Sequence, residues 1–219
     1  MAAWPQDCVL CLAPAGDALC GACAAALPWL DRACTRCAVP LPNGGMCVAC
    51  VVRAPAFDAA RSCFEYRFPL DRLVQRFKFA ADLALGRWLA ACMARVLCDE
   101  RADLLLVPPL ARSRLRERGF NQALELAKTL SRALDVPCRG EGLVRIRETQ
   151  PQPGLDRAER ARNLRGAFRC EASVAGLHVA LVDDVMTTGA TAQEIACVLR
   201  DRGAARVSVW TVARTPAPA

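Results

Sequence analysis

One run of thirteen residues carries the clearest pattern in the chain: Val179-Ala180-Leu181-Val182-Asp183-Asp184-Val185-Met186-Thr187-Thr188-Gly189-Ala190-Thr191. Its apolar start predicts a buried strand, which is followed by two adjacent acidic residues, a hydroxyl-rich turn and the start of a helix. Such a turn presents backbone N–H groups and threonine hydroxyls to an anion at the positive end of the helix, and Gly189 lets the backbone approach that anion closely. Asp183 and Asp184 would repel a phosphate, so we expect both to lie exposed at the strand end and to accept hydrogen bonds from hydroxyl groups or a metal-bound water. The pattern therefore predicts a site for a sugar 5-phosphate.

The residues around this run predict further strands and helices. Residues 104–107 and 206–212 are apolar runs typical of buried strands, and Phe64, Tyr66 and Phe68 alternate with charged residues as in a half-buried strand. Between the strands, apolar residues recur at helical spacing, with Asp82 and Gly203 as predicted helix caps. Strands that alternate with helices predict a mainly parallel α/β sheet, whose ligands bind beyond the carboxyl ends of the strands. The helical faces lie at 70–77, 86–97, 123–134 and 192–199, and no apolar period is present from 139 to 165.

Cysteines dominate the N-terminal part of the chain. Of 14 cysteines, eight form four pairs with a two-residue spacer. Such a spacer lets a tight turn direct two sulfur atoms at one ion, and two turns complete a tetrahedral shell around zinc. We predict two structural zinc sites, with sequential grouping preferred because it closes the shortest loops, and interleaved grouping as the alternative. The predicted ligands are Cys8, Cys11, Cys20 and Cys23, then Cys34, Cys37, Cys47 and Cys50.

Other uses of these cysteine pairs fit the sequence less well. A disulfide framework needs an export signal, and the first residues of the chain have neither a basic segment nor an apolar one. A redox pair is normally single, and an iron–sulfur cluster is not usually built from evenly repeated pairs. The remaining cysteines are predicted to be buried, inert thiols. These are Cys63, Cys92, Cys98, Cys138, Cys170 and Cys197.

Composition describes a folded protein with an uneven charge. The chain has 219 residues, a net charge of +7 and 54% hydrophobic residues, enough for an α/β domain and a small module. We place the module at residues 1–56 and the domain at residues 57–219, with a hinge at 51–56. The module has three arginines and three aspartates, so the excess positive charge lies in the domain. No run approaches about 18 uncharged apolar residues, and we expect no membrane span and a cytoplasmic location.

The thirteen-residue run resembles the motif that binds 5-phosphoribosyl 1-diphosphate (PRPP) in type I phosphoribosyltransferases. The resemblance implies that Asp183 and Asp184 bind the ribose hydroxyls and are the catalytic residues, and that Mg²⁺ is bound with the diphosphate. It further implies that the 5-phosphate, or that of another ribose 5-phosphate compound, is bound by the turn. The ligand-binding residues would be Val182, Asp183, Asp184, Thr187, Thr188, Gly189, Ala190 and Thr191.

Nearly the whole chain is similar to the ComF/GntX family, in which a double zinc ribbon precedes a type I phosphoribosyltransferase fold. The similarity rests on the cysteine pairs and on the segments 76–79, 115–122, 149–150 and 159–168. It implies that Pro109 and Leu110 lie in a diphosphate loop, although this chain has Val107-Pro108 where the family usually has a proline and an aliphatic residue. Further PRPP contacts implied by the family are Lys78, Arg118, Asn121 and Arg160, for which a surface or helix-capping role is the alternative. Arg147, Gln150, Arg157, Arg160 and Asn163 would belong to a mobile loop that closes over PRPP.

The resemblance connects the chain with natural competence, namely the cytoplasmic handling of incoming single-stranded DNA. Our first hypothesis is a PRPP-binding protein that acts in DNA uptake or related nucleic-acid metabolism, with single-stranded DNA and DNA-uptake proteins as candidate partners. The second is an adaptor for nucleic acid or protein whose PRPP pocket only senses the metabolite. The third is a phosphoribosyltransferase of nucleobase salvage. The sequence leaves the acceptor substrate and the oligomeric state open.

Overall fold

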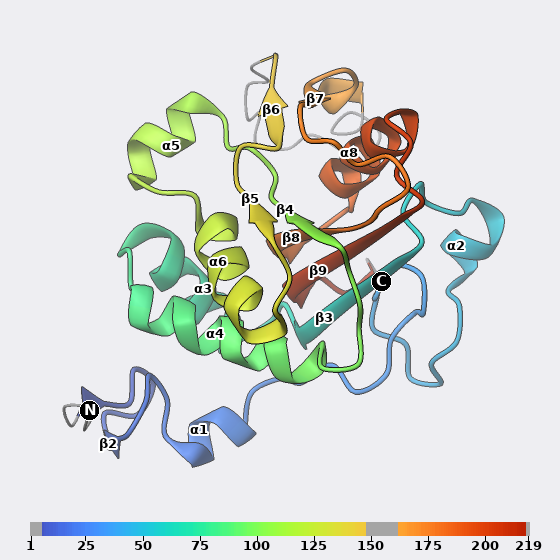
Figure 1. Cartoon of the computed structure of the whole chain (residues 1–219). Helices are drawn as coiled ribbons and strands as arrows, with labels where there is room; N and C mark the ends of the chain where they lie inside the picture. Colours follow the sequence, from blue (N-terminus) through green and yellow to red (C-terminus); the bar gives the residue numbers. More distant parts are fainter. Residues whose placement is uncertain (1–5, 148–161, 218–219) are drawn as a thin grey trace.

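A parallel sheet of five strands forms the centre of the structure, a computed structural model that describes residues 6–147 and 162–217. The strands lie in the order β3 (Ala59–Glu65), β9 (Arg206–Arg214), β8 (His178–Met186), β4 (Leu104–Leu106) and β5 (Cys138–Arg139) (Figure 1). Each strand runs parallel to its neighbours. All five carboxyl ends therefore point to the same side of the molecule, and the prediction of a parallel α/β sheet is confirmed.

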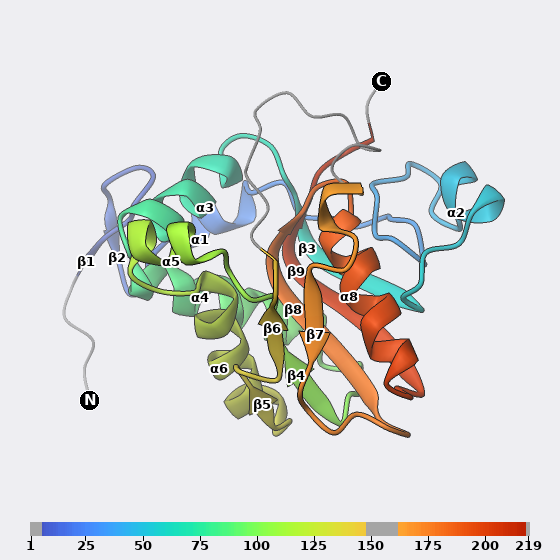
Figure 2. The same cartoon turned by 90° about the horizontal axis from the view of Figure 1, so that it is seen from above.

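Helices cover both faces of this sheet, as the view in Figure 2 shows. Ala180 and Val182 of β8 belong to the apolar cluster shared with three helices on one face. Val179 and Leu181 point the other way and join the cluster that contains Ile195 of the helix on the opposite face. The alternation follows from the two-residue period of a strand. The three helices are α3 (Leu70–Phe79), α4 (Leu83–Val96) and α6 (Gln122–Leu134), and the opposite helix is α8 (Ala190–Asp201).

Three shorter elements of the described residues lie outside the central sheet and its covering helices. Helix α5 (Arg112–Arg118) follows β4, and β6 (Leu143–Arg145) pairs antiparallel with β7 (Phe168–Cys170) in a sheet of their own. In Figure 1 these elements lie together at the top of the view.

The cysteine-rich segment divides into two halves that lie on different flanks of the domain (Figures 1 and 2). The first half holds β1 (Gln6–Asp7), β2 (Pro14–Ala15) and α1 (Gly21–Ala25), and its Leu19 and Leu27 join the apolar cluster of α3, α4 and α6. The second half holds α2 (Val48–Val52) and lies near β3 and α8.

A short bridge connects the two halves along the outer strand of the sheet. Trp29 pairs antiparallel with Phe64 of β3, and their ring centroids are 4.3 Å apart. The N–H of Leu30 donates to the carbonyl of Cys63 at 2.8 Å. Because an unpaired outer strand exposes hydrogen-bonding groups, this segment protects part of the edge of β3.

The helices and the strands at 104–107 and 206–212 follow the sequence predictions, and the Asp82 carboxylate caps α4 through the N–H of Leu85. The strand predicted from Phe64, Tyr66 and Phe68 was placed wrongly, because β3 ends at Glu65 and Phe68 is 74% exposed. A parallel strand that is buried on both faces does not alternate apolar with polar residues. The alternation from Phe64 to Phe68 therefore did not mark the strand, which lies mostly before it. The stretch from 139 to 165, which has no apolar period, contains the last residue of β5 and all of the short strand at residues 143–145.

Among the helices that the structure describes, none has the length and apolar character needed to cross a membrane.

Candidate functional site

The hydroxyl-rich turn lies between the end of β8 and the start of α8. Gly189 has a φ of 78°, in the left-handed region, and stands immediately before the first residue of α8. Its carbonyl accepts the N–H of Gln193 at 2.8 Å, and the Thr188 hydroxyl oxygen lies 3.3 Å from the N–H of Ala190. The first turn of α8 therefore presents its N–H groups at the carboxyl end of the sheet, where anions bind.

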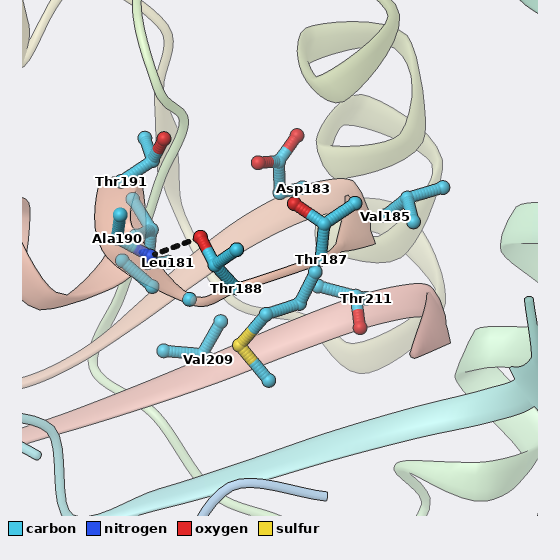
Figure 3. Close-up of a pocket in the computed structure, with 12 residues that line it drawn as sticks. Leu181, Asp183, Val185, Thr187, Thr188, Ala190, Thr191, Val209 and Thr211 are labelled. Carbon is cyan, nitrogen blue, oxygen red and sulfur yellow. Dashed lines mark hydrogen bonds between the residues drawn. The ribbon is translucent and has the colours of Figure 1, made fainter. Parts of the chain in front are cut away.

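This turn lines a small hollow of about 50 Å³. Figure 3 shows the side chains of Thr187, Thr188 and Thr191 around it, with the Asp183 carboxylate beside them. The floor is formed by strand residues, among which Thr211 of β9 pairs in register with Asp183. The hollow has hydroxyls and backbone N–H groups on one side and a carboxylate on the other. This arrangement suits a ligand that carries both an anionic group and hydrogen-bond donors.

The two acidic residues face opposite sides of β8, contrary to the expectation that both are exposed at a strand end. The strand continues through both acids to Met186, so its alternation applies to them. Asp183 is half-buried on the side of the hollow, whereas Asp184 is only 4% exposed, on the side of α3 and α6.

Asp184 forms an ion pair through one of its two carboxylate oxygens. Its Oδ1 lies 2.9 Å from Nζ of Lys78 and also accepts the N–H of Val185. Its Oδ2 is buried and accepts no hydrogen bond from the part of the chain that the structure describes. A buried acceptor without a donor typically costs about 1–3 kcal/mol, so this oxygen is a place where the donor of a ligand is favoured.

Asp183 has an altered acidity. Burial and the nearby Asp184 carboxylate raise the pKa of Asp183 to about 7, although the N–H of Asp184 and the positive charges of Lys78 and Arg118 act in the opposite direction. Perturbed carboxyl groups in a hollow are characteristic of functional sites.

Lys78 and Arg118 reach the site from separate helices. Lys78 is the penultimate residue of α3, and its side chain is 17% exposed. Arg118 ends α5, and its guanidinium carbon lies 5.0 Å from the ring centroid of Phe79. The Nε of Arg118 is buried and donates to no acceptor among residues 6–147 and 162–217. Both cations therefore lie beside the acidic pair.

Two other residues implied by the family resemblance, Asn121 and Arg147, form hydrogen bonds with the backbone of the chain. Both polar groups of Asn121 are engaged, because its Nδ2 donates to the Pro108 carbonyl at 3.1 Å and its Oδ1 accepts the N–H of Ala123 at 3.0 Å. Asn121 thus caps α6 and fixes the loop that contains Pro109 and Leu110. Arg147 donates to the carbonyls of Asn163 and Arg165. Gln150, Arg157 and Arg160 lie outside the described residues.

Sequence reasoning missed one residue of the site. Arg214, the last residue of β9, donates through Nη1 to the carbonyls of Met186, Thr187 and Thr215. Arg214 is 8% exposed, and its hydrogen bonds to Met186 and Thr187 hold the start of the hydroxyl-rich turn in place. The signal for it in the sequence was an arginine that follows the predicted strand 206–212 after one intervening residue.

The eight predicted metal ligands form two clusters. Within each of the sequential groups Cys8/11/20/23 and Cys34/37/47/50, the sulfur atoms lie within 4.8 Å of one another, which confirms the preferred grouping. The sulfurs of Cys11 and Cys20 are 3.7 Å apart, as are those of Cys37 and Cys47. A tetrahedron with Zn–S bonds of about 2.3 Å has edges of about 3.8 Å. Donor set and spacing thus fit two structural zinc ions.

Backbone donors favour the metal-binding form of one thiol in each cluster. Burial acts to raise the pKa of Cys8, but backbone N–H groups, that of Cys20 foremost, outweigh it and lower the pKa to about 6. Burial likewise acts to raise the pKa of Cys34, but backbone N–H groups outweigh it and lower the pKa to about 7. The foremost of these donors is the N–H of Cys47, which lies 3.3 Å from the sulfur of Cys34. Zinc binds thiolates, so these donors favour metal binding.

The cysteines outside the clusters are mostly covered. Cys63, Cys92 and Cys170 are buried, as predicted, and burial raises the pKa of Cys92 to about 12. Cys138 and Cys197 are half-buried, and for Cys98 the prediction was wrong, because this residue in the turn after α4 is exposed.

Comparison with known families agrees with this division. Residues 1–51 match the double zinc ribbon domain, and residues 121–219 match the phosphoribosyl transferase domain. The fold and the sites thus define a double-zinc-ribbon protein with a phosphoribosyltransferase domain.

Several relatives extend over most of the chain. DNA utilization protein YhgH of Salmonella typhimurium is 35% identical over 96% of this chain and 98% of its own. Competence protein F of Haemophilus influenzae is 37% identical over 77% of this chain and 78% of its own. Competence protein ComFC of Bacillus subtilis is 31% identical over 83% of this chain and 78% of its own. The chain belongs to the ComF family.

Proposed function

We propose that this protein binds PRPP together with Mg²⁺ in the cytoplasm and acts in DNA uptake or related nucleic-acid metabolism. Residues 57–219 would bind the ligand and residues 1–56 would hold two zinc ions. The observation that carries the proposal is the buried Oδ2 of Asp184, an acceptor without a donor among the described residues, on the strand that leads into a turn that suits a phosphate.

The ribose hydroxyls are the donors that suit the acidic pair. Asp183 and Asp184 offer carboxylate oxygens on the two faces of one strand end, and a carboxylate accepts hydrogen bonds but repels a phosphate. A vicinal diol, with two donors on adjacent carbons, can reach both residues. In this proposal Lys78 occupies Oδ1 of Asp184 and leaves Oδ2 available as an acceptor for the ligand.

The 5-phosphate suits the turn at the start of α8. Residues 187–191 supply backbone N–H groups, three threonine hydroxyls and the positive end of a helix of twelve residues. The left-handed Gly189 shapes this turn. Phosphate and carboxylates would then bind opposite ends of the same ribose.

The diphosphate would lie near the cations that surround the acidic pair. Arg118 has a buried Nε without an acceptor among the described residues, and Pro109 and Leu110 lie in the loop that precedes α5. Mg²⁺, when bound, neutralises charge on the diphosphate and retains several waters. In a transfer reaction, Lys78 and Arg118 would stabilise the departing charge, and the acidic pair would hold the ribose in place.

The proposed role in DNA metabolism rests on the family and on one surface. Relatives are named for competence and for DNA utilization. Residues 112–117 of α5 are all exposed, including Arg112, Arg114 and Arg116, and Phe79 close by is 62% exposed. Arginines beside an exposed aromatic ring are what single-stranded DNA needs for phosphate contacts and base stacking.

Calorimetry with PRPP and Mg²⁺, on the zinc-loaded full chain, tests the proposal. We expect saturable binding of one PRPP per chain. Asp183→Asn and Asp184→Asn should each weaken binding by roughly tenfold to more than a hundredfold, because each removes a charged acceptor. Asp201→Asn, the same change on an exposed residue at the far end of α8, should leave affinity unchanged.

Turnover distinguishes the three hypotheses. Release of diphosphate with a nucleobase indicates a salvage enzyme, and release with a nucleic-acid acceptor indicates an enzyme of DNA metabolism. Binding without release indicates the metabolite-sensing adaptor. If neither PRPP nor ribose 5-phosphate binds at millimolar concentration, the proposal is wrong.

A further inference from the structure

One arginine connects the second cysteine cluster to the hydroxyl-rich turn. The Nε of Arg214 donates to the carbonyl of Cys37 at 3.0 Å. Its Nη1 donates to the carbonyl of Met186 at 3.0 Å and to that of Thr187. Cys37 is one of four sulfur ligands, and Thr187 begins the turn. A single buried guanidinium therefore joins a metal-binding loop to the segment proposed to hold the phosphate.

Other contacts place the same half of the ribbon against the same region. The Oε1 of Gln193, in the first turn of α8, accepts the N–H of Ala56 at 2.8 Å. Ala38, which follows Cys37, is 2% exposed and belongs to the apolar cluster that includes Met186. The loop of the second cluster is thus built onto the start of α8.

The first cluster has a different neighbourhood. Its segment packs through Leu19 and Leu27 into the cluster of α3 and α4, with Trp88 among its members. In Figure 1, α1 lies below α4, whereas α2 lies at the right, beside β3 and α8. The two metal sites of one ribbon therefore offer a comparison within one molecule.

Loss of metal from the second cluster would act on the turn through Arg214. Zinc fixes the loop that carries the Cys37 carbonyl, because metal binding supplies folding free energy to such loops. A buried guanidinium requires its acceptors, and one that loses an acceptor shifts or draws in water. The Thr187 carbonyl depends on the same guanidinium, so the turn loses its fixed geometry and with it part of its affinity for an anion.

We propose that Arg214 is a positioning residue that couples zinc at the second cluster to the affinity of the turn for the 5-phosphate. Affinity for PRPP then depends on metal at Cys34, Cys37, Cys47 and Cys50 and not on metal at the first cluster. The proposal extends the proposed PRPP binding and rests on it.

Matched cysteine variants test the coupling. Cys47→Ser and Cys20→Ser remove the third ligand of each cluster, and both residues are half-buried and directly precede a short helix. Elemental analysis of each full-length variant should find one zinc fewer than in the parent. Cys47→Ser should then weaken PRPP binding about tenfold or more, as for loss of a charged hydrogen bond. Cys20→Ser should stay within about twofold of the parent.

A double-variant cycle isolates Arg214. Arg214→Lys keeps the charge but has one nitrogen in place of the fork that joins Cys37 to Thr187. It should weaken PRPP binding in the parent and cause little further loss in Cys47→Ser, because the connection is already broken. If the two losses add in full, the residues act independently and the coupling is absent.

Hydrogen exchange gives a reading that needs no PRPP. In Cys47→Ser the amides of residues 187–191 should exchange faster than in the parent, and in Cys20→Ser they should not. If the parent binds no PRPP, the proposed function fails while this exchange difference still reports the coupling. If both cysteine variants change the turn equally, or neither does, the coupling through Arg214 is wrong.

Discussion

Lys78 of α3 forms an ion pair with Asp184 of β8, with 2.9 Å between Nζ and Oδ1. The pair joins two elements more than 100 residues apart in sequence, and both side chains are largely buried. The pair is notable in a chain with 27 arginines and only two lysines. A lysine is a compact point charge and leaves the second carboxylate oxygen uncovered, whereas an arginine fork tends to cover both.

Replacing Lys78 should therefore affect both stability and binding. Lys78→Met leaves a buried carboxylate without its cation, which for buried pairs costs about 3–5 kcal/mol. The other lysine, Lys128, pairs with Glu125 on the exposed side of α6, and Lys128→Met should cost at most about 1 kcal/mol. Denaturant unfolding of both variants measures the difference. Equal costs would show that the Lys78 pair contributes no more than a surface pair.

Stability should depend on pH through Asp183. Its pKa is raised in the folded protein from 3.8 to about 7. The folded state therefore binds this proton more tightly than the unfolded chain, and the contribution of Asp183 to stability falls as pH rises from about 4 to 7. Unfolding midpoints of the parent and of Asp183→Asn, measured from pH 5 to 8, should diverge in that direction. Parallel curves would place the pKa of Asp183 near its ordinary value.

PRPP binding should show the opposite trend with pH. The ionised form of Asp183 is the better acceptor for ribose hydroxyls, so affinity should rise as pH increases through about 7. Asp183→Asn should bind weakly at every pH and lose this dependence. Calorimetry over the same pH range gives both curves, and a parent whose affinity falls with rising pH would contradict the role given to Asp183.

Metal content should follow the two cysteine clusters. Four thiolates per ion predict two zinc ions per chain. Elemental analysis of protein purified without added metal measures the number, and iron or a visible chromophore would contradict it. Chelation should unfold the loops of the first cluster, because much of the folding free energy of such loops comes from the metal. Helix α4, against which these loops pack, should stay folded.

The fold could be predicted from sequence because apolar spacing and one motif agreed. Leu70, Leu73, Val74 and Phe77 are all buried on one face of α3, as their spacing requires. The strand β3 was misplaced because both its faces are covered, so residues 59–65 show no alternation, whereas the partly exposed residues after it do.

The site was predicted in outline but not in geometry. The motif indicated which acids and hydroxyls belong together, but the burial of Asp184 depends on β8 extending to Met186 beside β9. Arg214 was missed because its partners are backbone carbonyls, which leave no trace in the residue pattern. The position of Lys78 opposite Asp184 depends on how α3 packs, and spacing along the chain does not specify that.

Single-stranded DNA should bind to the arginines of α5 if this surface has the proposed role. Affinity should fall with salt, by about 0.7 in log K per log salt for each phosphate contact. Reversing the charge of Arg112, Arg114 and Arg116 should lower that slope by about two. The same reversal at Arg87, Arg95 and Arg132, exposed on α4 and α6, should not change it. Fluorescence titrations at several salt concentrations measure the slope, and binding without salt dependence would exclude a phosphate contact surface.

The conformation of Gly189 allows strain and ligand contact to be separated. Gly189 and Gly176 have φ values of 78° and 74°, and a β-carbon at either would meet nothing closer than 3.7 Å. Alanine at each position should therefore cost the same backbone strain, about 1–2 kcal/mol. Only Gly189 lies in the turn that would hold the phosphate, so Gly189→Ala should also weaken PRPP binding, and Gly189→Val should abolish it. Gly176→Ala should keep the affinity of the parent at a matched loss of stability. If Gly189→Ala binds PRPP as Gly176→Ala does, the turn does not approach the ligand, and the phosphate must bind elsewhere.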